Sequence, residues 1–157
     1  MAPIPRPAIE RFLAKVNKGG PVPEHRPDLG PCWLWTGAKN KAGRGGFCVT
    51  TGQTHGRFVY AYVWSYEHFR GPIPPGLQPD HLCRNTACVH PWHLEVVTPR
   101  ENTLRGIGPA AVNARKTHCP QGHPYTGRNL LRSNGKRVCR TCNREKQRRY
   151  REQKSHH

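Results

Sequence analysis

A fifteen-residue segment, DHLCRNTACVHPWHL (residues 80–94), holds two Cys and three His, and it has the clearest chemical potential in the chain. Thiolate and imidazole groups are common zinc ligands in proteins. Cys83, Cys88 and His93 follow one another with four residues between neighbours, a spacing typical of zinc sites. The segment therefore predicts three ligands of a structural zinc ion, and it leaves the two residues that open it for other chemistry.

A closed tetrahedral site needs a fourth ligand, and the candidates are Cys32, Cys48 and His90. Cys32 is favoured because it stands at the edge of a strand-like stretch, CWLW, that could pack beside the segment. Cys48 lies within an apolar strand pattern, where a lone Cys is most often a buried free thiol. The first predicted zinc site is therefore Cys32 with the three ligands of the segment, and Cys48 is the alternative.

A second ligand set lies near the C-terminus. Cys119 and His123 form one pair, and Cys139 and Cys142 form another after a segment long enough for a hairpin with SNGK (residues 133–136) as its turn. A redox role for the CRTC sequence would need a βαβ context, which the pattern does not indicate. We therefore expect two structural zinc ions, each closed by four ligands and each contributing on the order of 10 kcal/mol to folding.

The elements around the first motif follow from local patterns. Residues 77–82 and 93–97 are typical of short strands. The letters TPREN, beginning at Thr98, indicate a helix start, with an N-cap, a Pro in the first turn and a Glu three residues after the cap. This helix carries Asn102 and Arg105 and should end near residue 106. The region is therefore predicted to fold as strand, irregular loop, strand and short helix.

The rest of the chain is expected to form short elements and connectors. The predicted elements are a helix over 8–16, strands over 32–36 and 46–51, a strand end leading into a helix over 58–69, a linker or short helix over 107–117, and a basic helix in the final segment NREKQRRYREQK. Residues 21–31 are Pro-rich and predict a connector.

The charge of the chain favours a polyanionic partner. Its 157 residues carry 26 Lys and Arg against 9 Asp and Glu, for a net charge of +17 and a pI near 10.3. Residues 1–105 account for +6 and residues 106–157 for +11. Nucleic acid is the simplest partner for such a field. No basic helix with a large apolar face is evident, so binding to an anionic membrane surface is disfavoured.

Composition also indicates a small core that needs metal. Hydrophobic residues make up 34% of the chain, and Gly and Pro number 16 each. The sequence shows neither a transmembrane run nor the apolar stretch of a signal peptide, so we expect a cytoplasmic protein. In a reducing compartment, the seven Cys are better interpreted as metal ligands than as disulfides.

The segment DHLCRNTACVHPWHLEVVTPRENTLRG (residues 80–106) resembles the ββα-metal, or His-Me finger, motif of HNH endonucleases. The upstream sequences CWLWTG and GPIPPGL resemble those of small phage-encoded HNH proteins, and CPQGH…CRTC is similar to the zinc tails of the same proteins. The Cys/His pattern also resembles that of His-Cys box homing endonucleases. The resemblance implies a phage-encoded DNA endonuclease that acts in a bacterial host.

The resemblance also implies roles for individual residues. His81 matches the general base that activates water, and Asn102 matches a ligand of one catalytic Mg²⁺ or Mn²⁺ ion. Asp80 matches a second ligand of that ion. Because neighbouring residues on a regular strand point to opposite faces, Asp80 could share the ion with Asn102 only if the strand bends. Arg105 matches an arginine that contacts phosphate.

We therefore expect an α+β fold with a zinc-stapled ββα-metal core over residues 1–106, including an N-terminal helix, and a zinc-binding basic module over residues 107–157. DNA is the expected partner, and a homodimer is one option for the oligomeric state. The residues expected to contact DNA are Arg105, Arg144, Arg148 and Arg149.

Two departures and two rival interpretations remain. His90 stands where the family usually has Asn, and Ala61-Tyr62-Val63 stands where relatives often have Ala-His-Arg. A non-catalytic, zinc-stabilised nucleic-acid-binding protein would also fit the charge and the zinc ligands, and charge alone does not exclude RNA as the partner. The binding interpretation, however, gives no role to Asp80, His81 or Asn102.

Overall fold

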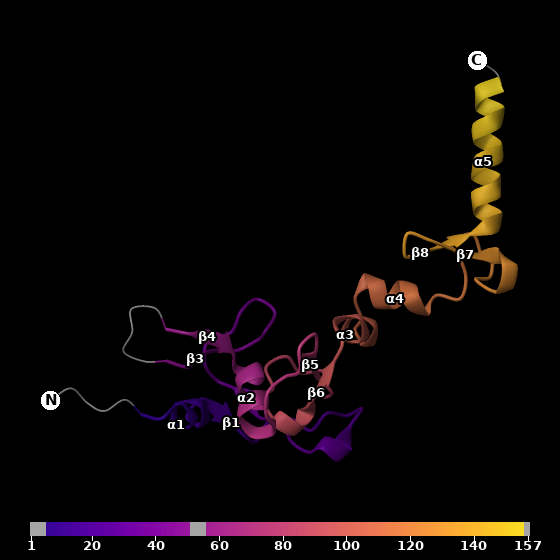
Figure 1. Cartoon of the computed structure of the whole chain (residues 1–157). Coiled ribbons are helices and arrows are strands. Elements are labelled where there is room, and N and C mark those ends of the chain that lie inside the picture. The colour runs from indigo at the N-terminus through magenta and orange to yellow at the C-terminus, as the bar shows by residue number, and fades with distance from the viewer. Residues whose placement is uncertain (1–5, 51–55, 156–157) are drawn as a thin grey trace. The chain divides into compact units, whose positions relative to one another are not determined.

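The computed structural model describes residues 6–50 and 56–155 of the chain. The chain divides into two compact units, Met1–Asn102 and Thr103–His157 (Figure 1). The break falls inside α3 (Pro99–Arg105), whose first residues belong to the first unit. Within the described residues, no helix is long and apolar enough to cross a membrane.

In its described residues, the first unit is built from three antiparallel two-stranded sheets and short helices. The strand pairs are β1 (Val16–Asn17) with β2 (Leu34–Trp35), β3 (Gly46–Cys48) with β4 (Phe58–Tyr60), and β5 (Gln78–His81) with β6 (Leu94–Val97). The helices are α1 (Ala8–Leu13), η1 (Pro27–Leu29), α2 (Ala61–Arg70) and η2 (Pro91–His93).

An aromatic cluster forms the core of this unit. The Phe12 ring lies 5.2 Å from the Trp35 ring, 5.4 Å from that of Phe47 and 4.5 Å from that of Trp64, measured between ring centroids. Phe12 and Trp35 are fully buried. Aromatic pairs at these separations add to the stabilisation that burial gives. The cluster joins α1, α2 and two of the three sheets, so a small number of large side chains holds the unit together.

The predicted strand–loop–strand–helix order is confirmed. In the β5–β6 pair, His81 lies opposite Leu94, and α3 follows β6 directly. The Thr98 hydroxyl accepts a hydrogen bond of 3.2 Å from the backbone N–H of Glu101, so Thr98 is an N-cap as predicted. With its helices, small sheets and Cys/His clusters, the chain has the predicted α+β class.

Two predicted boundaries were wrong in detail. The first helix ends at Leu13, and Val16 lies in β1 opposite Trp35. The backbone N–H of Thr36 donates to the carbonyl of Lys15 at 2.9 Å, so pairing with the distant β2 segment overrides the local helical pattern. The strand predicted over 46–51 spans only Gly46–Cys48, and residue 51 is outside the described residues.

The second unit contains one hairpin between helices. Its elements are α4 (Pro109–Arg115), η3 (Gly127–Asn129), β7 (Leu130–Ser133), β8 (Lys136–Cys139) and α5 (Arg140–Ser155). Asn134 and Gly135 connect the strands with φ angles of 48° and 71°, as a two-residue hairpin turn of type I′ requires. The predicted turn and the predicted basic helix are both present.

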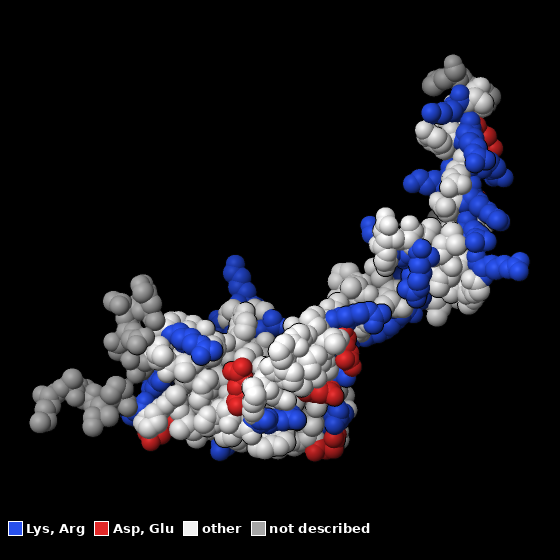
Figure 2. Space-filling model, viewed as in Figure 1, with Lys and Arg blue, Asp and Glu red and all other residues white. Residues whose placement is uncertain are grey.

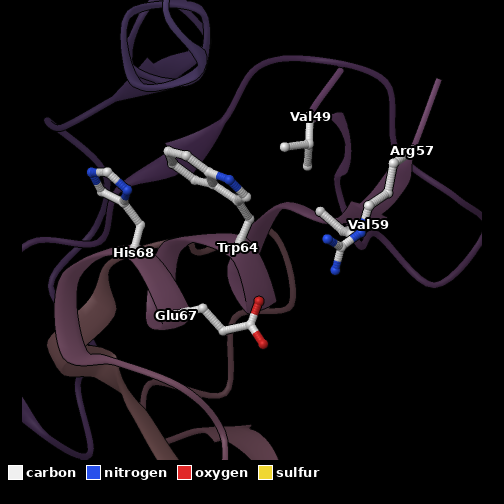
Figure 3. A pocket seen from close by; sticks show the side chains of 6 residues that line it. All are labelled: Val49, Arg57, Val59, Trp64, Glu67 and His68. Atoms are coloured by element: carbon white, nitrogen blue, oxygen red, sulfur yellow. The ribbon is translucent and has the colours of Figure 1, made fainter.

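A shallow hollow of about 240 Å³ lies beside α2 and the β3–β4 hairpin of the first unit (Figure 3). The ring of His68 stacks on that of Trp64 with centroids 4.6 Å apart, and both side chains line the hollow. The other lining residues are Val49, Arg57, Val59 and Glu67. None of the residues predicted to act in catalysis lines this hollow.

We predict that Gly45→Ala lowers the free energy of unfolding by about 1–3 kcal/mol, the usual cost of overpacking a core. A Cβ on Gly45 would overlap the indole ring of the buried Trp35. Gly46→Ala is the matched control, because nothing lies within 4 Å of a Cβ built there. Denaturant unfolding of the two zinc-loaded variants measures the difference, and equal stabilities would contradict this account of the core.

Candidate functional site

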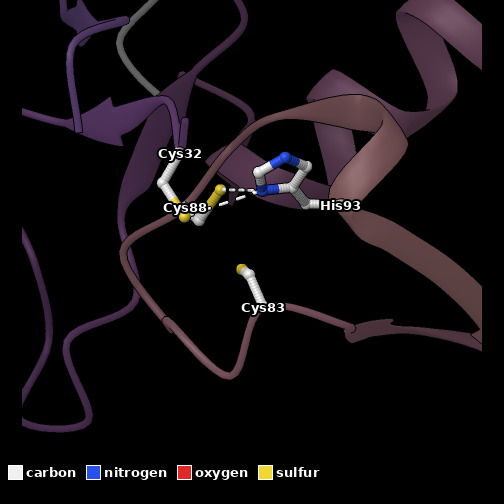
Figure 4. A group of neighbouring side chains, drawn as sticks. All are labelled: Cys32, Cys83, Cys88 and His93. Carbon is white, nitrogen blue, oxygen red and sulfur yellow. Dashed lines mark hydrogen bonds between the residues drawn. The ribbon is translucent and has the colours of Figure 1, made fainter. Parts of the chain in front are cut away.

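The first Cys/His cluster brings together Cys32, Cys83, Cys88 and His93, all of them buried (Figure 4). Their ligand atoms lie within 4.8 Å of one another. The Nδ1 atom of His93 is 3.6 Å from the Sγ atoms of both Cys32 and Cys88. Ligands at about 2.1–2.3 Å from a tetrahedral zinc ion would be about 3.6 Å apart, so the cluster could hold structural zinc.

Cys32 reaches the cluster because the stretch that follows it, which includes β2, runs along the loop that carries Cys88. The backbone N–H of Val89 donates to the carbonyl of Trp33 at 2.8 Å, and the N–H of Trp35 donates to that of Ala87 at 2.9 Å. These two hydrogen bonds align the CWLW stretch with the loop. They place Cys32 beside ligands more than fifty positions later in the sequence.

The orientation of His93 suits a metal ligand. Its Nε2 atom lies 2.9 Å from the carbonyl oxygen of Leu29, which can only accept a hydrogen bond. Nε2 must therefore carry the proton, and the lone pair of Nδ1 faces the thiols. Such outer hydrogen bonds fix the tautomer and ring angle of ligating histidines. Sequence reasoning missed Leu29, because a backbone carbonyl gives no signal in the residue type.

The protonation of the thiols also favours a cation. Burial raises the pKa of the Cys32 thiol to about 11. The hydrogen bond with Cys88 lowers the pKa of Cys83 to about 5, and the same contact with Cys83 raises the pKa of Cys88. Three buried thiolates therefore cannot coexist without a compensating charge. A zinc ion would supply it, and zinc deprotonates the thiols that it binds.

The two other fourth-ligand candidates lie outside the cluster. The thiol of Cys48 is half-buried and donates a 2.9 Å hydrogen bond to the carbonyl of Thr50. The ring of His90 stacks on that of His93 at 4.2 Å between centroids, and its Nδ1 atom accepts a 3.3 Å hydrogen bond from the backbone of Trp92. His90 therefore braces the loop without facing the thiols.

The second cluster contains Cys119, His123, Cys139 and Cys142. The Nδ1 atom of His123 is 3.5 Å from the Sγ atom of Cys119 and 3.2 Å from that of Cys142, and these two sulfurs are 3.6 Å apart. The donor set and distances resemble those of the first cluster, so this group could also hold zinc.

Asn129 braces the second cluster from η3. Its side-chain oxygen accepts hydrogen bonds from the backbone N–H and the hydroxyl of Thr141, at 3.1 Å and 2.9 Å. Its amide nitrogen donates to the sulfur of Cys139 at 3.5 Å and to the carbonyl of Pro124 at 2.6 Å. Asn129 thereby ties the ligands of β8 and α5 to the preceding loop, and sequence reasoning did not identify it.

His81 is buried at the end of β5, directly beside the first cluster. Its Nε2 atom lies 2.9 Å from the carbonyl oxygen of Cys88, and its ring lies 4.9 Å from that of Tyr62 between centroids. Burial lowers the pKa of His81, so the neutral imidazole is favoured. Because the carbonyl can only accept, Nε2 carries the proton and Nδ1 has a free lone pair that can act as a base.

The structure places the other predicted catalytic residues on β5 and α3. Asp80 is buried on β5, and its carboxylate forms a 3.5 Å ion pair with Arg84. Asn102 is half-buried on α3, and its backbone N–H donates to the carbonyl of Thr98. Arg105 is half-buried in the last turn of the same helix.

Basic side chains gather along α5 in the second unit (Figure 2). Arg149 lines a hollow of about 770 Å³ beside the second cluster, together with Lys146 and Tyr150. Arg144 and Arg148 are exposed and do not line this hollow, and Arg148 lies 3.7 Å from Glu152. The helix therefore presents positive charge both inside and outside the hollow.

Residues 59–104 match the family model described as HNH endonuclease. The matched region runs from β4 into α3 and includes His81, Asn102 and three of the four side chains of the first cluster. The predicted resemblance of this region to HNH endonucleases is therefore confirmed.

Three phage proteins are similar to the chain over part of its length. Protein 7.7 of Escherichia phage T7 is 35% identical over 72 residues, which are 46% of this chain and 52% of that protein. Protein 2.8 of the same phage is 36% identical over 73 residues, 46% of each chain. The uncharacterized gene 5.3 protein of Enterobacteria phage T3 is 36% identical over 42 residues, 27% of this chain and 42% of that protein.

The chain therefore spans about half the length, or less, of the curated relatives it matches. No solved structure gives a significant match.

We predict two zinc ions per chain, because each cluster offers four soft or imidazole ligands at tetrahedral distances. Cys32→Ser should reduce the zinc content to one ion. Cys48→Ser is the control and should keep both, because the Cys48 thiol bonds to Thr50 outside the cluster. Elemental analysis of the purified variants measures the content. Loss of an ion in Cys48→Ser, or two ions in Cys32→Ser, would contradict the ligand assignment.

Proposed function

We propose that this protein is a divalent-metal-dependent HNH DNA endonuclease in which His81 is the general base. The observation that supports this most directly is the hydrogen-bonded geometry of His81, which lies in the region that matches HNH endonucleases. A buried, neutral imidazole with one nitrogen held by a carbonyl has its other nitrogen available to take a proton. A non-catalytic zinc protein would have no use for this arrangement.

The proposed reaction is hydrolysis of a DNA phosphodiester. Nδ1 of His81 removes a proton from a water molecule, and the water oxygen forms a bond to phosphorus. The bond between phosphorus and the 3′ oxygen breaks, and that oxygen takes a proton from solvent. The products are a 3′ hydroxyl and a 5′ phosphate, and His81 returns its proton to solvent. General-base assistance of this kind contributes about 10²–10⁴-fold to a rate.

One Mg²⁺ or Mn²⁺ ion is assigned to the amide oxygen of Asn102, since hard oxygen donors suit these ions. The carboxylate of Asp80 is assigned as its second ligand on the condition that β5 bends at this residue when the ion binds. When bound, such an ion stabilises the negative charge that develops on the leaving oxygen. Arg105 is assigned to a phosphate contact. The zinc ions, in contrast, are assigned to folding, because all four ligand positions of each site come from protein side chains.

DNA affinity is assigned mainly to the C-terminal part of the chain. Residues 106–157 carry +11 of the net charge of +17, and Arg144, Arg148 and Arg149 lie on α5. Protein cations that neutralise DNA phosphates release counterions, so binding weakens as salt rises. The phage origin of the similar proteins fits an enzyme that acts in the cytoplasm of an infected bacterium.

His81→Ala should reduce the single-turnover rate of DNA cleavage by about 10²-fold or more, because the water loses its base. Its zinc content and DNA affinity should stay close to wild type. The measurement is cleavage of a saturated DNA substrate with Mg²⁺, beside a control with EDTA. Asn102→Ala should also cleave slowly, with partial rescue by Mn²⁺ or by more Mg²⁺ if it retains the ion poorly.

Cleavage by His81→Ala at the wild-type rate would rule out His81 as the base. If wild-type protein with both zinc ions binds DNA but shows no metal-dependent cleavage, the non-catalytic nucleic-acid-binding function replaces the nuclease.

We also predict that replacing Arg144, Arg148 and Arg149 with Ala makes DNA binding less salt-dependent. The slope of log affinity against log salt should fall by up to about 2.7, or about 0.9 for each phosphate that the variant no longer neutralises. A triple variant of the exposed residues Arg128, Arg132 and Lys136 removes the same charge from another part of the unit and is the control. Equal slopes for the two variants would show that the net charge of the unit, and not the position of the arginines on α5, sets the salt dependence of DNA binding.

A further inference from the structure

We propose that the second unit binds an unpaired nucleotide of a DNA strand in the hollow beside its Cys/His cluster, with the base stacked on Tyr150. The hollow measures about 770 Å³ and is lined by side chains of residues 121–153 alone, outside the region that matches the HNH family. The inference rests on the proposed function in taking DNA as the partner. It adds a preferred class of DNA, one that contains unpaired bases.

Two walls form the hollow, and the Cys/His cluster joins them. One wall is α5, which contributes Cys142, and the other is the loop of residues 119–123. The Nδ1 atom of His123 lies 3.2 Å from the Sγ atom of Cys142. The loop is closed by 2.9 Å hydrogen bonds from the N–H of Cys119 to the carbonyl of His123 and from the N–H of Gly122 to the carbonyl of Cys119. A ligand therefore does not have to order these walls, and such ordering is one of the costs of binding.

α5 turns different side chains toward the hollow and away from it. Four of the lining residues recur at intervals of three or four positions and so share one face of the helix: Cys142, Lys146, Arg149 and Gln153. At about 100° per residue, three exposed arginines fall on the opposite face: Arg144, Arg148 and Arg151. The far face is therefore free to contact phosphates, and the face in the hollow is free to take a different part of the nucleic acid.

Tyr150 supplies an aromatic surface in the hollow. Its side chain lines the hollow, and the residue is 59% exposed. α5 lies entirely within the described residues and none of its side chains is buried, so the ring does not serve a hydrophobic core. The Nζ atom of Lys154 lies 5.5 Å from the ring centroid and adds a cation beside it. Stacking of one base on an aromatic ring strengthens binding by roughly 5- to 150-fold.

The polar lining complements the other parts of a nucleotide. Lys146 and Arg149 provide two cations against the one carboxylate of Glu145, an excess of positive charge that suits a phosphodiester. Gln121 and Gln153 also line the hollow. Their amides can both donate to and accept from the edge of a base, and the Watson–Crick edge is available only when the base is unpaired.

The walls of the hollow favour an unpaired base over a duplex. Inside a duplex each base is stacked between its neighbours, so its face cannot reach the ring of Tyr150. A helix that reads paired bases must enter the major groove, which is about 12 Å wide and takes one helix. This face of α5 has the loop of residues 119–123 beside it, and the helix and the loop together are too wide for the groove. The hollow therefore suits a base that has left the stack.

The test measures the affinity of the full-length, zinc-loaded protein for two fluorescent probes at fixed salt without Mg²⁺. The probes are a short oligo-dT strand and a duplex of the same length. Tyr150→Ala should weaken binding of oligo-dT by about fivefold or more and binding of the duplex by less than about twofold, because only the unpaired base stacks. Tyr150→Phe should stay within about twofold of wild type on both probes, since it keeps the ring.

Arg148→Ala is the matched control, because it removes a cation from the opposite face of the same helix. It should weaken binding of both probes by similar factors, since a phosphate contact does not distinguish paired from unpaired DNA. Zinc content should be unchanged in every variant, because neither Tyr150 nor Arg148 belongs to a Cys/His cluster.

Four results would overturn the proposal. They are wild-type affinity of Tyr150→Ala for oligo-dT, an equal loss on both probes in this variant, a loss of its zinc, and displacement of labelled oligo-dT by dTMP as readily as by unlabelled oligo-dT. The last would mean that the hollow takes free nucleotides. Failure of the wild-type protein to bind either probe would overturn DNA as the partner and this inference with it. Absence of metal-dependent cleavage, in contrast, would remove the nuclease function and leave the nucleotide site standing.

Discussion

Cys88 connects the two parts of the candidate site, the buried Cys/His cluster and the proposed base His81. Its sulfur lies in the buried Cys/His cluster, while its backbone carbonyl lies 2.9 Å from Nε2 of His81. Whatever fixes the position of the sulfur therefore also fixes the hydrogen bond that orients the imidazole. In this arrangement the candidate zinc site and the proposed catalytic base are coupled through one residue.

The small core explains why zinc at the two clusters would matter for folding. The chain has 34% hydrophobic residues, and the part that the structure describes buries few large side chains beyond the aromatic cluster around Phe12 and Trp35. Domain stabilities are about 5–15 kcal/mol, and one structural zinc site can contribute on the order of 10 kcal/mol. Among the described residues each unit has one Cys/His cluster, so each can gain this stabilisation independently. Zinc at these clusters would replace the hydrophobic burial that this composition does not provide.

The sequence was informative where chemistry depends on residue type and short spacing. The two ligand sets, the Thr98 N-cap and the Asn134-Gly135 turn could all be predicted in this way. It was uninformative where backbone groups or distant segments decide the outcome. The carbonyls of Leu29 and Cys88, which set the tautomers of two histidines, leave no trace in residue type. Val16 pairs with Trp35 on a strand that a local helical pattern cannot anticipate.

The most direct test of this coupling is the protonation pattern of the His81 ring, observed by nitrogen-15 NMR of the zinc-loaded protein at neutral pH. The account predicts a proton on Nε2, which the Cys88 carbonyl accepts, and a bare Nδ1. A proton on Nδ1, or rapid exchange between the two tautomers, would contradict it. Either result would mean that the zinc-braced loop does not hold the base in the form that the proposed hydrolysis requires.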